Sequence, residues 1–134
     1  MKVVINRCYG GFGLSLIAQE MYAKLKGKQV YFYKWSNKEK KYFKVDNTET
    51  GLFLIALTRD FGDSMDEFPN GRFFGLHDIL RNDPDLIKVV EELGDKANGK
   101  CSNLGIVEIP DDIQYEITDY DGWETVEEAH RCWD

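Results

Sequence analysis

A strand-like run at the N-terminus passes directly into a helical pattern, with three glycines at the junction. Lys2 to Tyr9 is short and rich in β-branched residues, which is typical of a strand. Apolar residues then recur at three- and four-residue steps, as on one stripe of a helix, at Leu14, Ile17, Ala18, Met21, Tyr22 and Leu25. Ser15 is placed to cap this helix and Gly27 to end it. The chain therefore has to fold from a strand, a sharp turn and an amphipathic helix.

The rest of the chain supplies more strands and a second helix. Strand signals recur at Gln29 to Trp35, Lys41 to Val45, Leu52 to Leu57, Leu104 to Ile109 and Ile113 to Thr118. The apolar run from Leu52 to Leu57 also fits a buried helix, because periodicity alone does not separate the two. Asp83 and Pro84 begin the second helix, which Gly94 ends. Thr125 to Trp133 closes the chain as a short strand or helix.

One long segment between these elements has no clear periodicity. Thr58 to Arg81 carries Gly62, Pro69, Gly71 and Gly75, and we expect it to be irregular, with a short helical turn near Leu76 to Leu80. The resulting order is roughly β-α-β-β-β-α-β-β. We therefore predict an α+β fold in which a mixed β-sheet packs against two amphipathic helices. A chain of 134 residues fits a single globular domain, residues 1–134.

Charge and cysteine content restrict the functional classes. The formal net charge is −7, which disfavours broad contact with duplex nucleic acid or with an anionic membrane. A small anionic ligand needs only a few local cations or amides and stays compatible. We see no secretion signal and no apolar stretch long enough to cross a bilayer, so we expect a cytoplasmic protein. Cys8, Cys101 and Cys132 have no CxxC spacing and are expected to be free thiols.

Two segments resemble a known family. The N-terminal "VINRCYGGFGLS" and the C-terminal "VEIPDDIQYEITDYDGWETVEEAHRCW" are similar to a family of small proteins found mainly in bacteriophage genomes. The middle of the chain, from Gln29 to Arg81, matches less clearly. The family is largely without an assigned activity. Small phage proteins are often accessory factors, and some unrelated ones capture the nucleotide signals of bacterial immunity. By analogy, the resemblance implies an anti-defence role in the host bacterial cytoplasm.

The glycine-rich junction is the candidate ligand site. The first amides of a helix have no partners within the helix, and glycines let an oxyanion approach them. Arg7 can neutralise a phosphate and Tyr9 can stack on a base. The predicted ligand-binding residues are Arg7, Tyr9, Gly10, Gly11, Phe12, Gly13 and Ser15. The pattern is neither a dinucleotide-binding fingerprint nor a P-loop.

Each of these residues also has a purely structural interpretation. The glycines can serve only a sharp turn, with Ser15 as an ordinary helix cap. Arg7 can pair with one of the many carboxylates, and Tyr9 can be half-buried. A zinc site from Cys8, Cys101, His130 and Cys132 lacks any known spacing. Cys8 as a nucleophile with His77 or His130 has equally little support. We therefore predict no metal, no cofactor and no catalytic residue.

Two further features suggest contacts with other proteins. The C-terminal third is strongly acidic, a solvated face that can also bind a partner, with Asp111, Asp112, Asp119, Asp121, Glu124, Glu127 and Glu128. Part of a calcium-loop pattern occurs at Asp119 to Gly122, without the rest of that loop. The segments around Tyr31 to Trp35 and Tyr42 to Phe43 are aromatic. An exposed aromatic face there favours a homo-oligomer or a stacking platform.

Three functions stay open at this point. The first is a phage accessory protein, expected to be oligomeric, that sequesters a small phosphorylated or nucleotide ligand without making or breaking bonds. The second is an inhibitor that binds a host protein through its acidic surface. The third is a small hydrolase, which we disfavour because no nucleophile, base and orienting group can be recognised together.

Overall fold

The computed structural model describes residues 1–49, 54–67, 71, 74–75 and 79–128. Two helices, a short 3-10 helix and eight strands are present in this part of the chain. Their bounds, in chain order, are β1 (Lys2–Asn6), α1 (Leu16–Leu25), β2 (Tyr31–Ser36), β3 (Lys41–Val45), β4 (Leu54–Leu57), β5 (Ser64–Met65), α2 (Pro84–Leu93), η1 (Gly94–Ala97), β6 (Leu104–Glu108), β7 (Tyr115–Tyr120) and β8 (Trp123–Glu128). The predicted α+β class with two helices is confirmed.

The strands are distributed over three sheets rather than one. β1 pairs with β6, β7 pairs with β8, and the largest sheet has the order β4-β2-β3-β5. Every one of these pairs is antiparallel. Short turns join β2 to β3 and β7 to β8, as is possible for antiparallel neighbours.

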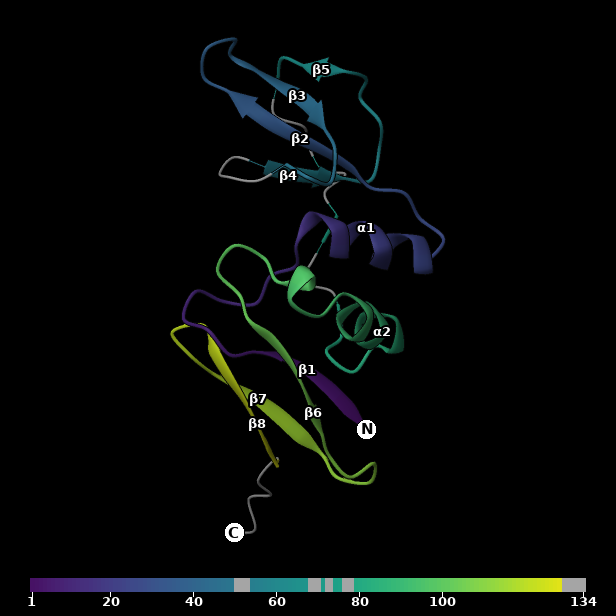
Figure 1. Cartoon of the computed structure of the whole chain (residues 1–134), viewed down its shortest axis with the longest axis vertical. Helices are drawn as coiled ribbons and strands as arrows, with labels where there is room; N and C mark the ends of the chain where they lie inside the picture. The colour runs from purple at the N-terminus through teal and green to yellow at the C-terminus, as the bar shows by residue number, and fades with distance from the viewer. Residues whose placement is uncertain (50–53, 68–70, 72–73, 76–78, 129–134) are drawn as a thin grey trace.

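Figure 1 shows how these units are arranged. The four-stranded sheet lies at one end of the molecule, and β1, β6, β7 and β8 lie at the other. α1 runs between them, with α2 on the side of β1 and β6. The hairpin of β7 and β8 lies beside β1, and β8 contacts that strand.

Capping explains where the helices begin. The Ser15 hydroxyl accepts a hydrogen bond from the Ala18 amide at 3.2 Å, as predicted for the start of α1. Asp83 caps α2 in the same way through the Asp85 amide at 2.9 Å, with Pro84 in the first turn. Gly94 follows α2, so both predicted ends of that helix are confirmed.

The main core forms between the helices and one face of the β1–β6 pair. Its buried members come from β1, α1, α2 and the segments beside them: Val4, Leu14, Ala18, Tyr22, Ile79, Leu86, Val89, Val90 and Ala97. Leu104 and Ile106 of β6 pack against this cluster. Val3 and Ile5, which alternate with Val4, are also buried on the other face of β1.

Both faces of β2 are covered, which differs from the exposed aromatic face considered above. Phe32 and Tyr33 point to opposite sides of the strand and are both buried. The Tyr33 hydroxyl donates to the Gly62 carbonyl at 2.8 Å and accepts from the Phe61 amide at 3.0 Å. This loop therefore closes over one side of the sheet, and Phe43 is the large apolar residue of the β2–β3 hairpin that remains exposed among the described residues.

Several predicted boundaries move. β1 ends at Asn6, so Arg7 and Tyr9 lie beyond the strand and its alternation does not relate them. β7 begins at Tyr115. Of the strand predicted at 52–57, residues 54–57 form β4, and residues 52 and 53 lie outside the described residues. The helical turn predicted near 76–80 lies partly outside the described residues. So does the closing strand or helix predicted at 125–133, of which residues 125–128 belong to β8. The Asp121–Gly122 turn joins β7 and β8 with a positive φ at both positions, as the DG dipeptide predicts.

Candidate functional site

The three glycines after β1 lie where three backbone segments meet. Gly10 has a φ of 142°, and a Cβ built on it would lie 2.7 Å from the Cβ of Cys101. A Cβ on Gly122 would lie 2.5 Å from the Gly10 nitrogen and still closer to that of Gly11. Real side chains do not approach so closely, so neither Gly10 nor Gly122 has room for one. A Cβ on Gly11 or Gly13, by contrast, would meet nothing within 4 Å.

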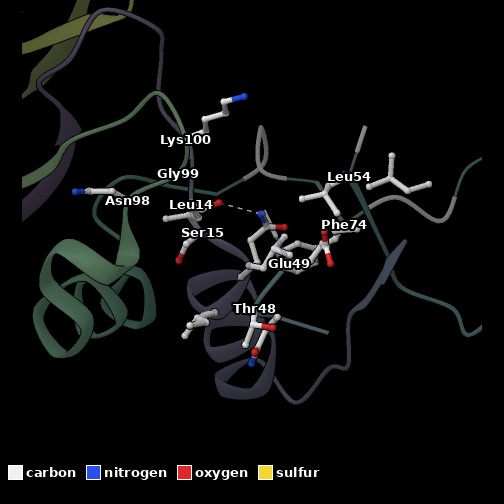
Figure 2. A pocket seen from close by; sticks show the side chains of 15 residues that line it. Leu14, Ser15, Thr48, Glu49, Leu54, Phe74, Asn98, Gly99 and Lys100 are labelled. Atoms are coloured by element: carbon white, nitrogen blue, oxygen red, sulfur yellow. Dashed lines mark hydrogen bonds between the residues drawn. The ribbon is translucent and has the colours of Figure 1, made fainter. Parts of the chain in front are cut away.

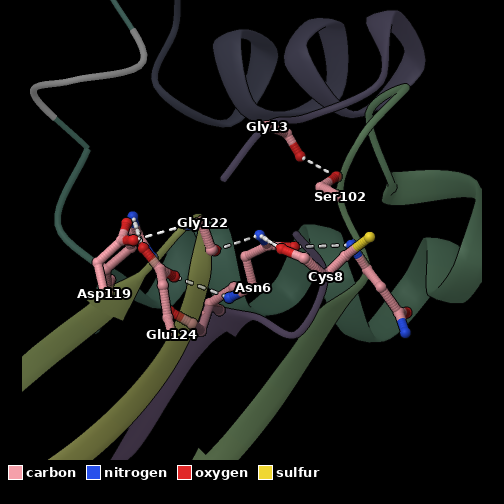
Figure 3. Close-up of polar contacts among 10 residues, drawn as sticks. Asn6, Cys8, Gly13, Ser102, Asp119, Gly122 and Glu124 are labelled. Atoms are coloured by element: carbon pink, nitrogen blue, oxygen red, sulfur yellow. Dashed lines mark hydrogen bonds and ion pairs between the residues drawn. The ribbon is translucent and has the colours of Figure 1, made fainter. Parts of the chain in front are cut away.

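Asn6 joins the same three segments through its side chain (Figure 3). Its amide nitrogen donates to the carbonyls of Cys8 at 2.8 Å and Gly122 at 2.7 Å. Its amide oxygen accepts from the Asn103 backbone at 2.8 Å. Asn6 is completely buried, so each of these bonds satisfies a group that has little access to water. The sequence alone offered no signal for this role beyond a polar residue at the end of a strand.

Glu124, expected on an acidic surface, is instead buried beside Asn6. It is only 4% exposed, and its carboxylate accepts from the backbone amide of Asn6 at 2.8 Å. Arg81 forms a two-pronged ion pair with it, with one nitrogen–oxygen distance of 2.8 Å. A buried carboxylate needs such a partner because its desolvation is unfavourable. The pair ties β8 to the segment that precedes α2.

The start of α1 is covered by the segment that follows α2. The Ser15 hydroxyl donates to the Lys96 carbonyl at 2.6 Å, and the Ser15 amide donates to the Ala97 carbonyl at 3.0 Å. Gly13 accepts from the Gly99 amide and from the Ser102 hydroxyl. Of the main-chain hydrogens from Gly11 to Ser15, which were candidates for an oxyanion, that of Ser15 therefore already has a partner inside the protein. The Gly10 amide has one as well, because it donates to the Asp121 carbonyl at 3.3 Å.

The side chains of the predicted site do not converge on one point. Arg7 is exposed and lies over Gly105 of β6. Tyr9 is also exposed, and its ring lies 5.3 Å from that of Trp123. Phe12 packs under the Arg81 guanidinium, whose carbon is 3.7 Å from the ring centre. Arg7 forms no ion pair with a carboxylate of the described residues, so the structural interpretation of Arg7 has no supporting contact there.

The cysteines and histidines do not form a centre in the part of the chain that the structure describes. Cys8 is half-buried, Cys101 is exposed, and both are free thiols. His77, His130 and Cys132 lie outside the described residues, so neither the zinc alternative nor the nucleophile alternative is tested in full. No group of three or more metal-binding side chains occurs within the described ranges.

A cavity of about 1040 Å³ opens on the other side of the α1 start (Figure 2). Its walls are mostly apolar and come from α1, β4 and the segments beside them, including Leu14, Leu16, Ile17, Leu54, Ile55, Ala56 and Phe74. Phe74 is held in place because its amide donates to the Ala56 carbonyl at 2.9 Å and its ring meets that of Tyr22 edge-on. A concave, largely apolar cavity of this size suits a small molecule.

Polar groups line two parts of the rim. Asn98, Gly99 and Lys100 lie near the start of α1, and Thr48 and Glu49 lie farther along the helix (Figure 2). Glu49 is neutralised by Lys34 at 2.6 Å. Lys100 is exposed and forms no ion pair with any described residue. The rim therefore carries one uncompensated positive charge among its described residues, close to a helix start.

Gln19 lies inside this lining and is nearly buried. Its side-chain nitrogen donates to the Leu14 carbonyl at 3.0 Å, which fixes the first turn of α1. Among the described residues that line the cavity, Ser15 is the one that also belongs to the seven residues predicted to bind a ligand. Sequence patterns missed the cavity because its residues come from distant segments. The α1 stripe and the strand at 52–57 were recognisable as elements, but no local pattern showed that they would face each other.

Comparisons with known proteins add no relative. No model of a protein family, no curated protein and no solved structure matches the chain. The similarity to small bacteriophage proteins therefore stays a prediction. Within the described residues, neither helix has the length and apolar character that crossing a membrane requires.

Proposed function

We propose that this protein binds and sequesters a small phosphorylated or nucleotide ligand without chemical conversion, as a phage accessory protein acting in the host bacterial cytoplasm. The observation that carries the proposal is the cavity beside the start of α1. Its volume suits a ligand of nucleotide size, and its apolar walls suit a base. A sponge for an immune nucleotide signal is one form of this function.

The charges at the rim support an anionic ligand. Lys100 supplies a cation without a partner among the described residues, while Lys34 offsets the one rim carboxylate, Glu49. A phosphate near Lys100 would also lie close to the positive end of the α1 dipole. The base would then pack against Phe74 and Leu54, and Thr48 is available for hydrogen bonds to it.

The lining favours binding over catalysis. Ser15 is the sole hydroxyl near the helix start among the described lining residues, and it is held by Lys96 and Ala18. A nucleophile needs a base and an orienting group within hydrogen-bond reach. No such set is formed by the described residues that line the cavity.

A thermal-shift screen of nucleotides and cyclic nucleotides tests the proposal. A ligand at about one hundred times its Kd should stabilise the fold by about 2.7 kcal/mol. Lys100→Ala should weaken binding by about 10-fold or more, since a charge-assisted contact to phosphate is lost. Lys28→Ala, which removes an equally exposed lysine away from the cavity, is the matched control.

The same screen separates the cavity from the site expected from the sequence. Arg7→Ala should leave binding unchanged if the ligand occupies the cavity, because Arg7 lies over Gly105 and does not line it. Loss of binding in Arg7→Ala but not in Lys100→Ala would return the ligand to the glycine-rich junction. No shift with any nucleotide removes the proposal, and recovery of a cleaved ligand would replace it with hydrolysis.

Homo-oligomer formation is a separate part of the proposal. Burial of Phe32 and Tyr33 within the chain removes the aromatic face that first suggested it, and leaves Phe43 exposed on the β2–β3 hairpin. Sedimentation velocity over a range of concentrations tests it. A species heavier than the 15.5 kDa chain that dissociates in Phe43→Glu supports assembly through this hairpin.

A further inference from the structure

The hairpin of β7 and β8 presents an outer face that none of the described elements covers. Its three cross-strand pairs are Glu116 with Glu127, Thr118 with Thr125, and Tyr120 with Trp123. All six residues are exposed. Most of the residues that alternate with them are covered by the protein, namely Tyr115, Ile117, Glu124 and Val126.

Aromatic rings gather at the turn end of this face. Tyr120 is 76% exposed and Trp123 is 40% exposed, and Tyr9 lies against Trp123 with 61% of its surface exposed. Exposed aromatic clusters of this kind mark interaction surfaces, because tyrosine and tryptophan contribute strongly to binding energy. Their ring faces also attract guanidinium groups.

Two carboxylates lie side by side at the other end. Glu116 and Glu127 are directly opposite each other in the ladder. Like charges at such positions destabilise a hairpin. Residues 115–128 contain no lysine or arginine, and neither glutamate forms an ion pair with a described residue. A cation from another molecule would relieve this repulsion.

The two ends are separated by four residues along each strand, or about 13 Å at the usual rise of a strand. An extended peptide repeats its side-chain direction every two residues, so its residues four apart have the same spacing and the same direction. Charge complementarity therefore defines the partner. The aromatic end suits an arginine, and the carboxylate end suits a second basic residue.

We infer that the outer face of the β7–β8 hairpin binds an extended basic segment of another protein, with arginine against Trp123 and Tyr120 and a second basic residue between Glu116 and Glu127. This surface is distinct from the cavity beside α1, so it stands or falls independently of the proposed ligand. Neither Lys100 nor any other cavity residue belongs to it.

Fluorescence anisotropy with labelled synthetic peptides tests the inference. The probe has the core Arg-Thr-Val-Thr-Arg, and the control peptide has the same composition in the order Arg-Thr-Val-Arg-Thr, which places the second arginine on the opposite side. The probe should bind at least about 10-fold more tightly than the control, and its affinity should fall with added salt.

Matched variants locate the binding. The double variant Glu116→Gln with Glu127→Gln should lower the affinity for the probe by about 10-fold. Tyr120→Ser should also lower this affinity, and it should leave the fold intact because Tyr120 is exposed. Glu92→Gln with Asp112→Asn removes the same charge from other exposed positions and should leave affinity unchanged. Thermal melts of each variant show that the fold is intact.

Three outcomes would overturn the inference. The first is no probe binding at concentrations of about 1 mM, the weakest affinity worth considering. The second is equal affinity for both peptides or for the Glu116 and Glu127 variant. The third is self-association through Trp123, which would assign the face to a second copy of the chain.

Discussion

At the scale of single residues, close contact of the chain with itself explains Gly10 of the glycine-rich junction, but not Gly11 or Gly13. Gly122 rests on Gly10 and Gly11, and Gly10 rests on Cys101, at distances that exclude any side chain. The presence of glycine thus has a structural explanation at Gly10. A ligand at the Gly10 amide would have to displace the β7–β8 turn, because that amide donates to the Asp121 carbonyl.

Gly122→Ala tests this explanation. Gly122 has a φ of 92°, which is unfavourable for alanine, and the new methyl group would also collide with the Gly10 and Gly11 backbone. Gly62→Ala is the control, because Gly62 has a similar φ of 90° but open space around it. We expect the control to lose about 1–2 kcal/mol of unfolding free energy and Gly122→Ala to lose about 1–3 kcal/mol more, measured by urea unfolding. Equal losses of unfolding free energy in Gly122→Ala and Gly62→Ala would show that a methyl group fits between Gly122 and the backbone of Gly10 and Gly11.

The buried Arg81–Glu124 pair makes a second prediction at this scale. Glu124→Ala should lower the unfolding free energy by about 3–5 kcal/mol, because it leaves the Arg81 guanidinium and the backbone amide of Asn6 without their partner. The double variant with Arg81→Met should cost less than the sum of the two single changes. The exposed pair of Lys2 and Glu91 is the comparison, where Glu91→Ala should cost less than about 1 kcal/mol. Additive losses at Arg81 and Glu124 would mean that the two groups act separately.

At the scale of elements, a polar network joins the end of α1 to the start of α2. The Tyr22 hydroxyl donates to Asp83 at 2.7 Å, and Lys26 pairs with Asp83 and Asp85, each at 2.9 Å. Burial, together with the hydrogen bond to Asp83, raises the pKa of Tyr22 to about 12. Burial acts against the charged form of Asp83, but the hydrogen bonds from Tyr22 and Lys26 outweigh it and lower the pKa of that carboxyl.

The shift at Asp83 predicts a contribution to acid sensitivity. Its pKa is lower in the folded protein than in the unfolded chain, so its contribution to the unfolding free energy is complete above about pH 4 and is lost as the pH falls through the folded-state pKa. Asp83→Asn keeps a side chain that can cap α2 but removes the charge. We expect a loss of about 1 kcal/mol near neutral pH and a shallower pH dependence below about pH 4, measured by urea unfolding.

In Asp83→Asn, the loss of unfolding free energy at acid pH should become smaller but should not disappear. The pKa values of Asp46, Asp60 and Asp111 are lowered as well, by hydrogen bonds from Thr48, Lys44 and the N-terminal ammonium group respectively. Tyr22→Phe serves as the control for the hydroxyl. If the unfolding free energy of Asp83→Asn depends on pH as it does in the unaltered protein, the network does not stabilise the charged form of Asp83.

At the scale of the whole molecule, the apolar core is unevenly distributed. The main cluster joins α1, α2, β1 and β6, whereas Phe32, Tyr33 and Leu57 of the four-stranded sheet are buried outside it. Regions with fewer buried apolar contacts open at lower free energy. The cavity lies between α1 and β4, at the border between these two regions.

Amide hydrogen exchange tests this distribution. Amides of β2 and β3 should exchange at a lower opening free energy than those of β1 and α2, because the latter belong to the main core. A ligand in the cavity should slow exchange in β4 and the first turn of α1 together, since both line it. Uniform protection throughout the chain would instead support a single cooperative domain over residues 1–134.

The local elements were predictable because their signals lie within a few residues of one another. Ser15 and Asp83 cap the helices as expected, and Asp121 with Gly122 forms a hairpin turn of the kind that this dipeptide favours. The acidic C-terminal third was predicted less well. Glu124 differs from its neighbours through Arg81, which is 43 residues away in the chain, and through the backbone amide of Asn6, which is 118 residues away. No local pattern records such pairings.

The amino-acid sequence by itself determined the two helices, most strands and the α+β class, since periodicity, caps and turn residues act over short distances. Tertiary structure alone decided that Gly10 and Gly122 serve close contact within the chain, that Asn6 and Glu124 are buried, and that a cavity opens between α1 and β4. These features depend on which distant segments meet. Such meetings are set by the packing of the whole chain, because the backbone groups and charges that become buried need partners from elsewhere in the fold.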